Sequence, residues 1–379
     1  MIYLDNSATS FPKPDSVIRA VNDSMRYFSA NPGRSGHRMS INTALKVFEC
    51  RKAVCNLFNI DDESKVIFTS GCTHSLNTVI KGILKPYDHC VISCLEHNSV
   101  LRPLEKLKDK NVSYSVATVF PDDNDKTLDS FRKCINERTR LIVCTHASNV
   151  FGIRLPVERI CALAHSYSIP FCLDAAQSAG VLPIDISKDR YDFVCCAGHK
   201  GLYGPMGIGL LLLNSEILPD SLIEGGTGSL SQNPMQPDFT PDKYESGTLN
   251  IPGICGLKKG IEQVYNKGIN TIEHHENKLI RLLYKSLRNI RGVELYTAIP
   301  ELDKSAPVLS FTIKGKSSED VAAYLDRHYG IAVRAGLHCS PLAHKFMNTI
   351  DNGTVRVSPS MFTTENDIKK LIYAIKNYN

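Results

Sequence analysis

A cysteine at position 339 lies in a stretch that favours a thiolate. The sequence reads VRAGLHCSPLAHK over 333–345, and the window 327–350 contains no Asp or Glu. Pro341 suits the first turn of a helix and Ser340 the cap before it, so we expect Cys339 just outside a helix N-terminus, where the dipole favours an anion. Four nearby side chains can add positive charge: Arg334, His338, His344 and Lys345. The alternative is a loop cysteine that simply lacks acidic neighbours.

Two apolar runs end in residues that could bind and use a carbonyl compound. PFCLDAAQSAG carries Asp174 and, one turn later, Gln177, while DFVCCAGHKGLYGPMGIG carries His199 and Lys200. A lysine within apolar sequence can lose its proton and attack a carbonyl, and a carboxylate at such depth needs a cation or donors. Singly, Asp174 could form a salt bridge and Lys200 could lie on a surface turn. Together they meet needs of pyridoxal phosphate.

Three further turns follow predicted strands. SGCTHSLN has a Gly and hydroxyl residues, including Thr73, opening a helix, which is how backbone N–H groups are offered to a phosphate. His97 follows HCVISC and Asn149 follows RLIVCTH. Each of these residues, taken alone, is as well explained as a helix cap or a hydrogen-bonded loop residue.

The elements that must position these residues alternate along the first two-thirds of the chain. Apolar runs predict strands at 66–69, 89–94, 113–119, 140–146, 170–174, 192–197 and 207–213, with helices such as 73–84 and 156–167 between them. This pattern indicates an α/β fold with a mostly parallel seven-stranded sheet flanked by helices. A helix over about 271–288 and a smaller α+β domain follow. We predict a large domain over 16–250 and a smaller one formed by 1–15 and 251–379.

Composition narrows the function classes. The net charge of +5 is spread along the 379 residues without a basic block, which disfavours nucleic acid as a partner. We expect neither a signal peptide nor a membrane span, and hence a cytoplasmic protein. The thirteen cysteines are expected to be reduced thiols, and their spacing predicts no metal site.

The order of these motifs resembles the class V aminotransferase family over nearly the whole chain. DNSATS, GCTHSLN, EHNS, SNVFG, DAAQSAG, GHKGLYGPMGIG, ESGTLN and VRAGLHC occur in the family's order, and the likeness is greatest to the cysteine desulfurases. RAGLHC resembles the short active-site loop of their second group, since the other group has a longer mobile loop. The resemblance implies a fold-type I pyridoxal-phosphate enzyme and a homodimer.

The resemblance also implies a role for each site residue. Lys200 would form the Schiff base and move protons, His97 would stack on the cofactor ring, and Asp174 would bind the pyridinium nitrogen. The implied cofactor contacts are completed by Gln177 and Asn149 at the phenolate oxygen and by Thr73, His199 and, from the other subunit, Thr248 at the phosphate. Arg356 of TVRVS would bind the substrate carboxylate, with Asn149 beside it.

Two positions depart from the family pattern. Cys72 stands in the phosphate-binding turn where a second hydroxyl residue is frequent, and Ala197 stands where many members have a serine. We count Cys72 among the cofactor-binding positions, and we expect each departure to remove a phosphate contact and to weaken cofactor binding without touching the chemistry.

The implied reaction is conversion of L-cysteine to L-alanine, with the sulfur held on Cys339 as a persulfide. A sulfur-acceptor protein would collect it, for iron-sulfur cluster assembly or for other thiolations. Alternatives are a selenocysteine lyase, or an aminotransferase or lyase of the same family that uses no protein persulfide. A cofactor-binding fold kept as a scaffold is a further alternative, against which the intact Lys200, Asp174 and Cys339 argue.

Overall fold

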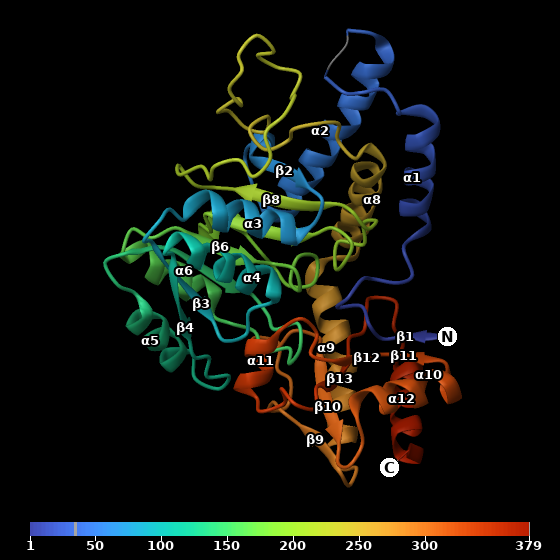
Figure 1. Cartoon of the computed structure of the whole chain (residues 1–379). Helices are drawn as coiled ribbons and strands as arrows, with labels where there is room; N and C mark the ends of the chain where they lie inside the picture. Colours follow the sequence, from blue (N-terminus) through green and yellow to red (C-terminus); the bar gives the residue numbers. More distant parts are fainter. Residues whose placement is uncertain (34–35, 379) are drawn as a thin grey trace.

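A computed structural model describes residues 1–33 and 36–378 of the chain. Its centre is a seven-stranded sheet whose spatial order is β2-β8-β7-β6-β5-β3-β4 (Figure 1). The strands are β2 (Val66–Thr69), β3 (His89–Ser93), β4 (Ser113–Ala117), β5 (Thr139–Thr145), β6 (Phe171–Asp174), β7 (Phe193–Ala197) and β8 (Gly209–Leu213). All seven predicted strands are confirmed. Only β8 runs antiparallel to its neighbours, β2 and β7.

Helices cover both faces of this sheet, which explains why most of its strands are apolar on both sides. On one face lie α3 (Cys72–Ile83) and α4 (Asn98–Leu107), which share a core with residues such as Ile67 and Ile92. The other face packs against α2 (Arg38–Phe58), α5 (Asn124–Cys134), α6 (Val157–Ser166) and α8 (Ile251–Lys267). The outermost helix, α1 (Asp15–Tyr27), packs on α8. The short helices η1 (Glu63–Lys65), η2 (Lys108–Lys110) and α7 (Ile186–Asp189) complete this part.

A second core lies in the C-terminal part. It is built on a four-stranded antiparallel sheet, ordered β12-β13-β10-β9, and the helices around it. The strands are β9 (Val293–Leu295), β10 (Leu309–Ile313), β12 (Arg334–Gly336) and β13 (Thr354–Val357), and the helices are α9 (Ile269–Leu287), α10 (Ser318–Tyr329), α11 (Pro341–Phe346) and α12 (Glu365–Tyr378).

The first residues of the chain join this C-terminal part. Strand β1 (Ile2–Tyr3) pairs in parallel with β11 (Ile331–Ala332), and Asp5 forms a bridge with Ser358. Figure 1 shows the two termini on the same side of the molecule. The domain boundaries at 15/16 and 250/251 stay a prediction.

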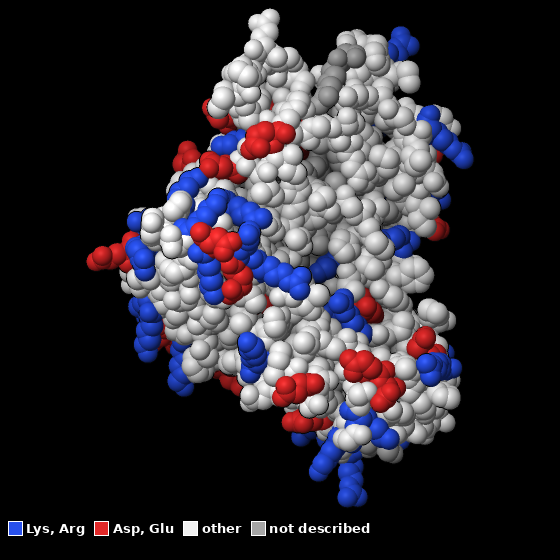
Figure 2. All heavy atoms as spheres, in the orientation of Figure 1, with Lys and Arg blue, Asp and Glu red and all other residues white. Residues whose placement is uncertain are grey.

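The surface carries charges of both signs. Figure 2 shows Lys and Arg side chains intermixed with Asp and Glu over the visible face. In residues 1–33 and 36–378, no helix has the length and apolar character needed to cross a bilayer.

Candidate active site

Several of the predicted site residues lie at one edge of the large sheet, where the carboxyl ends of its strands meet. Strands β2, β3, β5, β6 and β7 all end there, because β8 alone is reversed. Gly209, the first residue of β8, pairs with both Thr69 and Ala197 at this edge. A Cβ atom on Gly209 would lie 2.5 Å from Cα of Gly71, so only glycine lets β8 pass so close to the turn before α3.

Lys200 and Asp174 follow neighbouring strands of this edge. Asp174 is the last residue of β6 and is 3% exposed, and its Oδ1 accepts a 2.9 Å bond from the N–H of Ala176. Lys200 comes three residues after β7 and lines a cavity of about 30 Å³ together with Gln177. Burial lowers the pKa of Lys200, while the nearby Cys72 and Asp174 partly oppose this shift. A lowered pKa favours the neutral form of the Lys200 amine, which is the form that nucleophilic chemistry requires.

His97 is fixed by a short network at the start of α4. It is the N-cap of that helix, and its Nδ1 accepts a 3.0 Å bond from the N–H of Ser99. The Ser99 hydroxyl is 2.8 Å from this Nδ1 and 2.8 Å from the hydroxyl of Thr73. Burial lowers the pKa of His97 to about 4, so its ring is neutral and carries its proton on Nε2. The network ties the ring-stacking candidate to the phosphate-binding candidate.

The site has unused donors where an anionic group would bind. The first turn of α3 begins at Gly71 without a side-chain cap, and Thr73 is exposed there. The Nδ1 atom of His199 is buried and has no hydrogen-bond partner among residues 1–33 and 36–378, and burial lowers the pKa of this ring to about 4. An unpartnered buried polar atom is costly unless a ligand completes it. These residues fit a phosphate-bearing cofactor.

Gln177 and His199 also anchor the N-terminal segment. Nε2 of Gln177 donates a 3.1 Å bond to the carbonyl of Ser7. The carbonyl of His199 accepts bonds from the N–H of Ser10 and from Nζ of Lys13. Burial lowers the pKa of Lys13 to about 8. The sequence analysis assigned no role to Ser7, Ser10 or Lys13, although the two serines lie within the DNSATS motif and Lys13 follows it.

The loop that carries Cys339 is attached to two of these large-sheet turns. The N–H of Asn98 donates a 2.8 Å bond to the carbonyl of Cys339. Asn149 binds the residues on either side of it: Nδ2 donates to the carbonyl of His338 at 2.8 Å, and Oδ1 accepts from Ser340 Oγ at 2.6 Å. Cys339 is exposed, whereas His338 and Ser340 are buried. The side-chain amide of Asn149, which the resemblance assigns to the phenolate oxygen, is therefore hydrogen-bonded to the cysteine loop.

The expected position of Cys339 beside a helix is confirmed, but part of the expected positive charge is wrong. Helix α11 begins at Pro341 with Ser340 as its N-cap residue, although the serine side chain bonds Asn149 and not the helix. Burial lowers the pKa of His338 to about 2, and it also lowers the pKa of His344. Both rings are neutral near pH 7, because the interior that surrounds them does not solvate a charge.

Arg356 is a buried cation on β13. It is 1% exposed, and its Nη2 pairs with Oδ1 of Asp5 at 2.6 Å. Nη1 donates a 2.9 Å bond to the carbonyl of Asn149, while Nε has no partner among the described residues. The positive charge of Arg356 also acts on Lys200. Arg356 is thus hydrogen-bonded to the loop of Asn149 and acts electrostatically on the candidate lysine, Lys200.

Thr248 lies apart from the other candidates. It is exposed on the segment between β8 and α8, and within the described residues its side chain makes no hydrogen bond to the rest of the site. Three residues earlier, Glu245 pairs with Arg51 at 2.5 Å, with both side chains buried, and accepts a bond from the N–H of Phe68. This ion pair fixes the start of the ESGTLN motif on α2 and β2.

Two buried titratable residues of this edge were not predicted. Glu96 is fully buried, its Oε1 accepts from Ser93 Oγ and from the N–H of Thr145, and burial raises its pKa to about 8. Both ring nitrogens of His146 are buried without partners, and burial lowers its pKa to about 3. Both residues are neighbours of predicted ones in the sequence, but nothing local in the sequence signals their burial.

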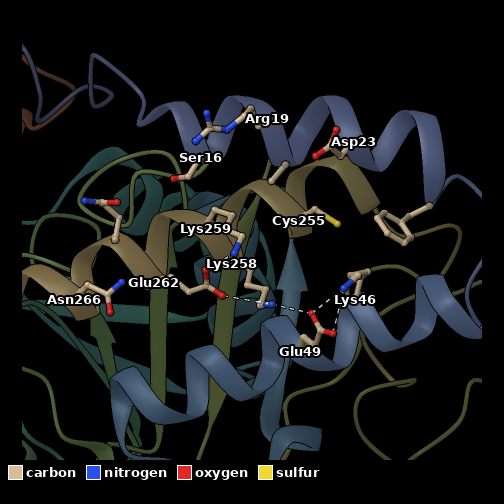
Figure 3. A pocket seen from close by; sticks show the side chains of 13 residues that line it. Ser16, Arg19, Asp23, Lys46, Glu49, Cys255, Lys258, Lys259, Glu262 and Asn266 are labelled. Atoms are coloured by element: carbon tan, nitrogen blue, oxygen red, sulfur yellow. Dashed lines mark hydrogen bonds and ion pairs between the residues drawn. The ribbon is translucent and has the colours of Figure 1, made fainter.

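Other features of the described residues hold no part of this site. A hollow of about 520 Å³ lies between α1, α2 and α8, where Lys46 and Lys258 both pair with Glu49 (Figure 3). None of the candidate residues lines it. Within residues 1–33 and 36–378, no group of three His, Cys, Asp or Glu side chains could hold a metal ion.

Comparison with known proteins places the chain in a family. The family model for aminotransferase class-V matches residues 2–371, so the chain belongs to that family. A probable cysteine desulfurase of Methanothermobacter thermautotrophicus is 32% identical over 98% of this chain and 92% of its own length. One of Borreliella burgdorferi is 34% identical over 99% of this chain and 91% of its own length. The apo structure of a cysteine desulfurase from Thermococcus onnurineus superposes with a TM-score of 0.92 at 32% identity, covering 100% of this chain and 94% of that one.

Proposed function

We propose that the chain is a cysteine desulfurase that uses pyridoxal phosphate and collects sulfur on Cys339. The contact that carries the proposal joins the N–H of Asn98 to the carbonyl of Cys339 at 2.8 Å. This contact joins the residue that carries the exposed thiol to the residue next to His97, the candidate ring-stacking residue. The names of the relatives support the same activity.

Pyridoxal phosphate is the proposed cofactor because the donors present suit its parts. Lys200 would hold its carbonyl carbon, Asp174 its ring nitrogen and His97 its ring face. Its phosphate would meet Thr73, the unpartnered Nδ1 of His199 and Thr248 of a second subunit. When bound, this cofactor supplies an electron sink that stabilises negative charge on the α-carbon of an amino acid.

The residues of the chain would carry out the other steps. The neutral amine of Lys200 accepts the α-proton of L-cysteine, while Arg356 binds the substrate carboxylate. The Cys339 thiolate attacks the substrate sulfur, so that an S–S bond forms and the Cβ–S bond breaks with its electron pair left on carbon. That carbon then takes up a proton, and the α-carbon regains its proton from Lys200. L-Cysteine and the protein thiol thereby become L-alanine and a protein persulfide, with no external oxidant.

The proposal includes a homodimer, a sulfur acceptor and a cytoplasmic location. Helix α2 exposes about half of each of four large apolar side chains, Met39, Ile41, Leu45 and Phe48, which a second subunit would cover. The exposed position of Cys339 suits transfer of its sulfur to an acceptor protein, which could serve iron-sulfur cluster assembly. The thirteen free cysteines suit a reducing compartment.

The test measures alanine formation from L-cysteine by the cofactor-loaded protein and by Cys339→Ser. Alanine from the wild type alone, with one extra sulfur on Cys339 in the mass spectrum, would support the proposal. Equal alanine formation by both proteins would refute the persulfide step and make L-selenocysteine the next substrate. If neither protein produced alanine, another class V reaction would be favoured.

A further inference from the structure

The segment around Cys339 has an unusual backbone. His338 has φ 51° and Cys339 has φ 59°, so two successive non-glycine residues are left-handed. This backbone conformation is strained for any residue other than glycine. Conformations of this kind persist only where surrounding contacts enforce them. The carbonyl groups of His338 and Cys339 are both hydrogen-bonded to the large-sheet part, by Asn149 and Asn98.

The side chains of Asn149 and Ser340 supply the specific part of this restraint. The carbonyl of His338 can only accept, which fixes Nδ2 of Asn149 on its side and leaves Oδ1 for the Ser340 hydroxyl. Asn149 is 8% exposed and Ser340 is 0% exposed, so water does not compete with these bonds. The Ser340 hydroxyl donates its hydrogen bond to Asn149, although Ser340 is the N-cap residue of α11. The cap position is therefore used to fix the cysteine and not the helix.

We propose that Asn149 and Ser340 form a clamp that positions the thiol of Cys339. Asn149 then acts on Cys339 through the loop that carries it. The predicted effect of the clamp on turnover rests on the proposed function, whereas its predicted effect on the position of the Cys339 thiol does not. The same residue accepts from Arg356 through its own carbonyl, so the clamp is fixed to the candidate carboxylate-binding residue.

The clamp predicts a division between two steps of the reaction. Removal of the α-proton needs Lys200 and not Cys339, whereas sulfur transfer needs Cys339 in place. Ser340→Ala and Asn149→Ala should therefore slow alanine formation from L-cysteine by about tenfold, the effect expected for loss of one buried hydrogen bond. Exchange of the α-proton of L-alanine for solvent deuterium should be unchanged in Ser340→Ala, because Ser340 has no assigned contact with the cofactor or the substrate. Asn149→Asp keeps the acceptor for Ser340 but sets an oxygen against the His338 carbonyl, and it should lie between wild type and Asn149→Ala.

A second readout does not depend on activity. Cys339 is the exposed thiol, Cys134 is half-buried and the remaining eleven cysteines are buried, so iodoacetamide should modify Cys339 first. Both clamp variants of the cofactor-loaded protein should be alkylated several times faster at Cys339, as shown by peptide mass mapping. Ser24→Ala is the matched control, because Ser24 is 1% exposed and donates a 2.7 Å bond to a carbonyl within α1.

The outcomes separate the two proposals. Wild-type alkylation and turnover in Ser340→Ala would overturn the clamp, as would a parallel loss of α-proton exchange in the same variant. If the wild type produced no alanine from L-cysteine, the proposed function would fail, and the alkylation rates would still test the clamp. Should Asn149→Ala not fold, Ser340→Ala and Asn149→Asp answer the same question.

Discussion

The thiol of Cys72 lies 3.5 Å from Oδ1 of Asp174 and 3.3 Å from the carbonyl oxygen of Cys195. Burial raises the pKa of this thiol, so it remains a neutral, weak donor. Its neighbour Thr73 is exposed at the mouth of the site. The side chain of Cys72 is therefore turned toward the carboxylate that would face the cofactor ring, and away from the phosphate-binding turn.

We predict that substitution of Thr73 weakens the binding of pyridoxal phosphate, whereas substitution of Cys72 does not. Cys72→Ser should leave the dissociation constant for pyridoxal phosphate almost unchanged, because the side chain points inward. Thr73→Ala should raise it by about tenfold, the usual effect of losing a hydrogen bond to a charged group. Fluorescence titration of the cofactor-free proteins measures both constants. A tighter complex in Cys72→Ser would show that this position does reach the phosphate.

Lys200→Ala should lower the rate of alanine formation by about a thousandfold or more, because it removes both the amine that holds the cofactor and the base. The near-ultraviolet and visible absorbance of the loaded protein should change as well. Lys200→Arg is the matched control, since it keeps a long basic side chain that cannot lose its proton. Turnover by Lys200→Ala at the wild-type rate would exclude the assigned role.

Glu96 should make the protein less stable as the pH rises. Burial raises its pKa from 4.5 to about 8 in the folded protein. A carboxyl group with a raised folded pKa stabilises the fold fully below its unfolded pKa, and this contribution is lost as the pH rises through the folded value. Denaturant unfolding at a series of pH values between 4.5 and 8 should show this loss in the wild type.

Glu96→Gln should remove that part of the pH dependence, because the amide keeps an acceptor for Ser93 and for the N–H of Thr145. The exposed Glu137→Gln is the control and should retain the wild-type profile. Identical profiles for wild type and Glu96→Gln would mean that Glu96 is ionised in the fold.

The buried pair of Arg51 and Glu245 should be essential for stability. Glu245→Ala leaves the Arg51 charge buried without its partner and should lower the free energy of unfolding by about 3–5 kcal/mol. Replacing both residues with apolar ones, Arg51→Met with Glu245→Leu, should recover most of this loss. Urea unfolding of the three proteins measures the difference, and an additive loss in the double variant would contradict the argument.

The sequence was sufficient for the strands and for residues that directly follow them. Lys200, Asp174 and His97 were predictable because each follows an apolar run, and parallel strands end at a common edge. The pairing of Asn149 with Ser340 was not, since 191 residues separate them and no local pattern reports such a contact. The neutral state of His338 was missed for a related reason, because burial depends on the whole packed structure.

Residues near the start of the sequence contact residues near its end at the candidate site. Asp5 pairs with Arg356, and Asn6 donates to the carbonyl of Ser358, contacts that join residues about 350 positions apart. Synthesis proceeds from the N-terminus at roughly 5–20 residues per second, so the first strand waits tens of seconds for its partners to leave the ribosome. Arg356, the candidate carboxylate-binding residue, therefore pairs with Asp5 only after about 350 further residues have been made. A partly made chain would carry a folded central sheet without a working active site.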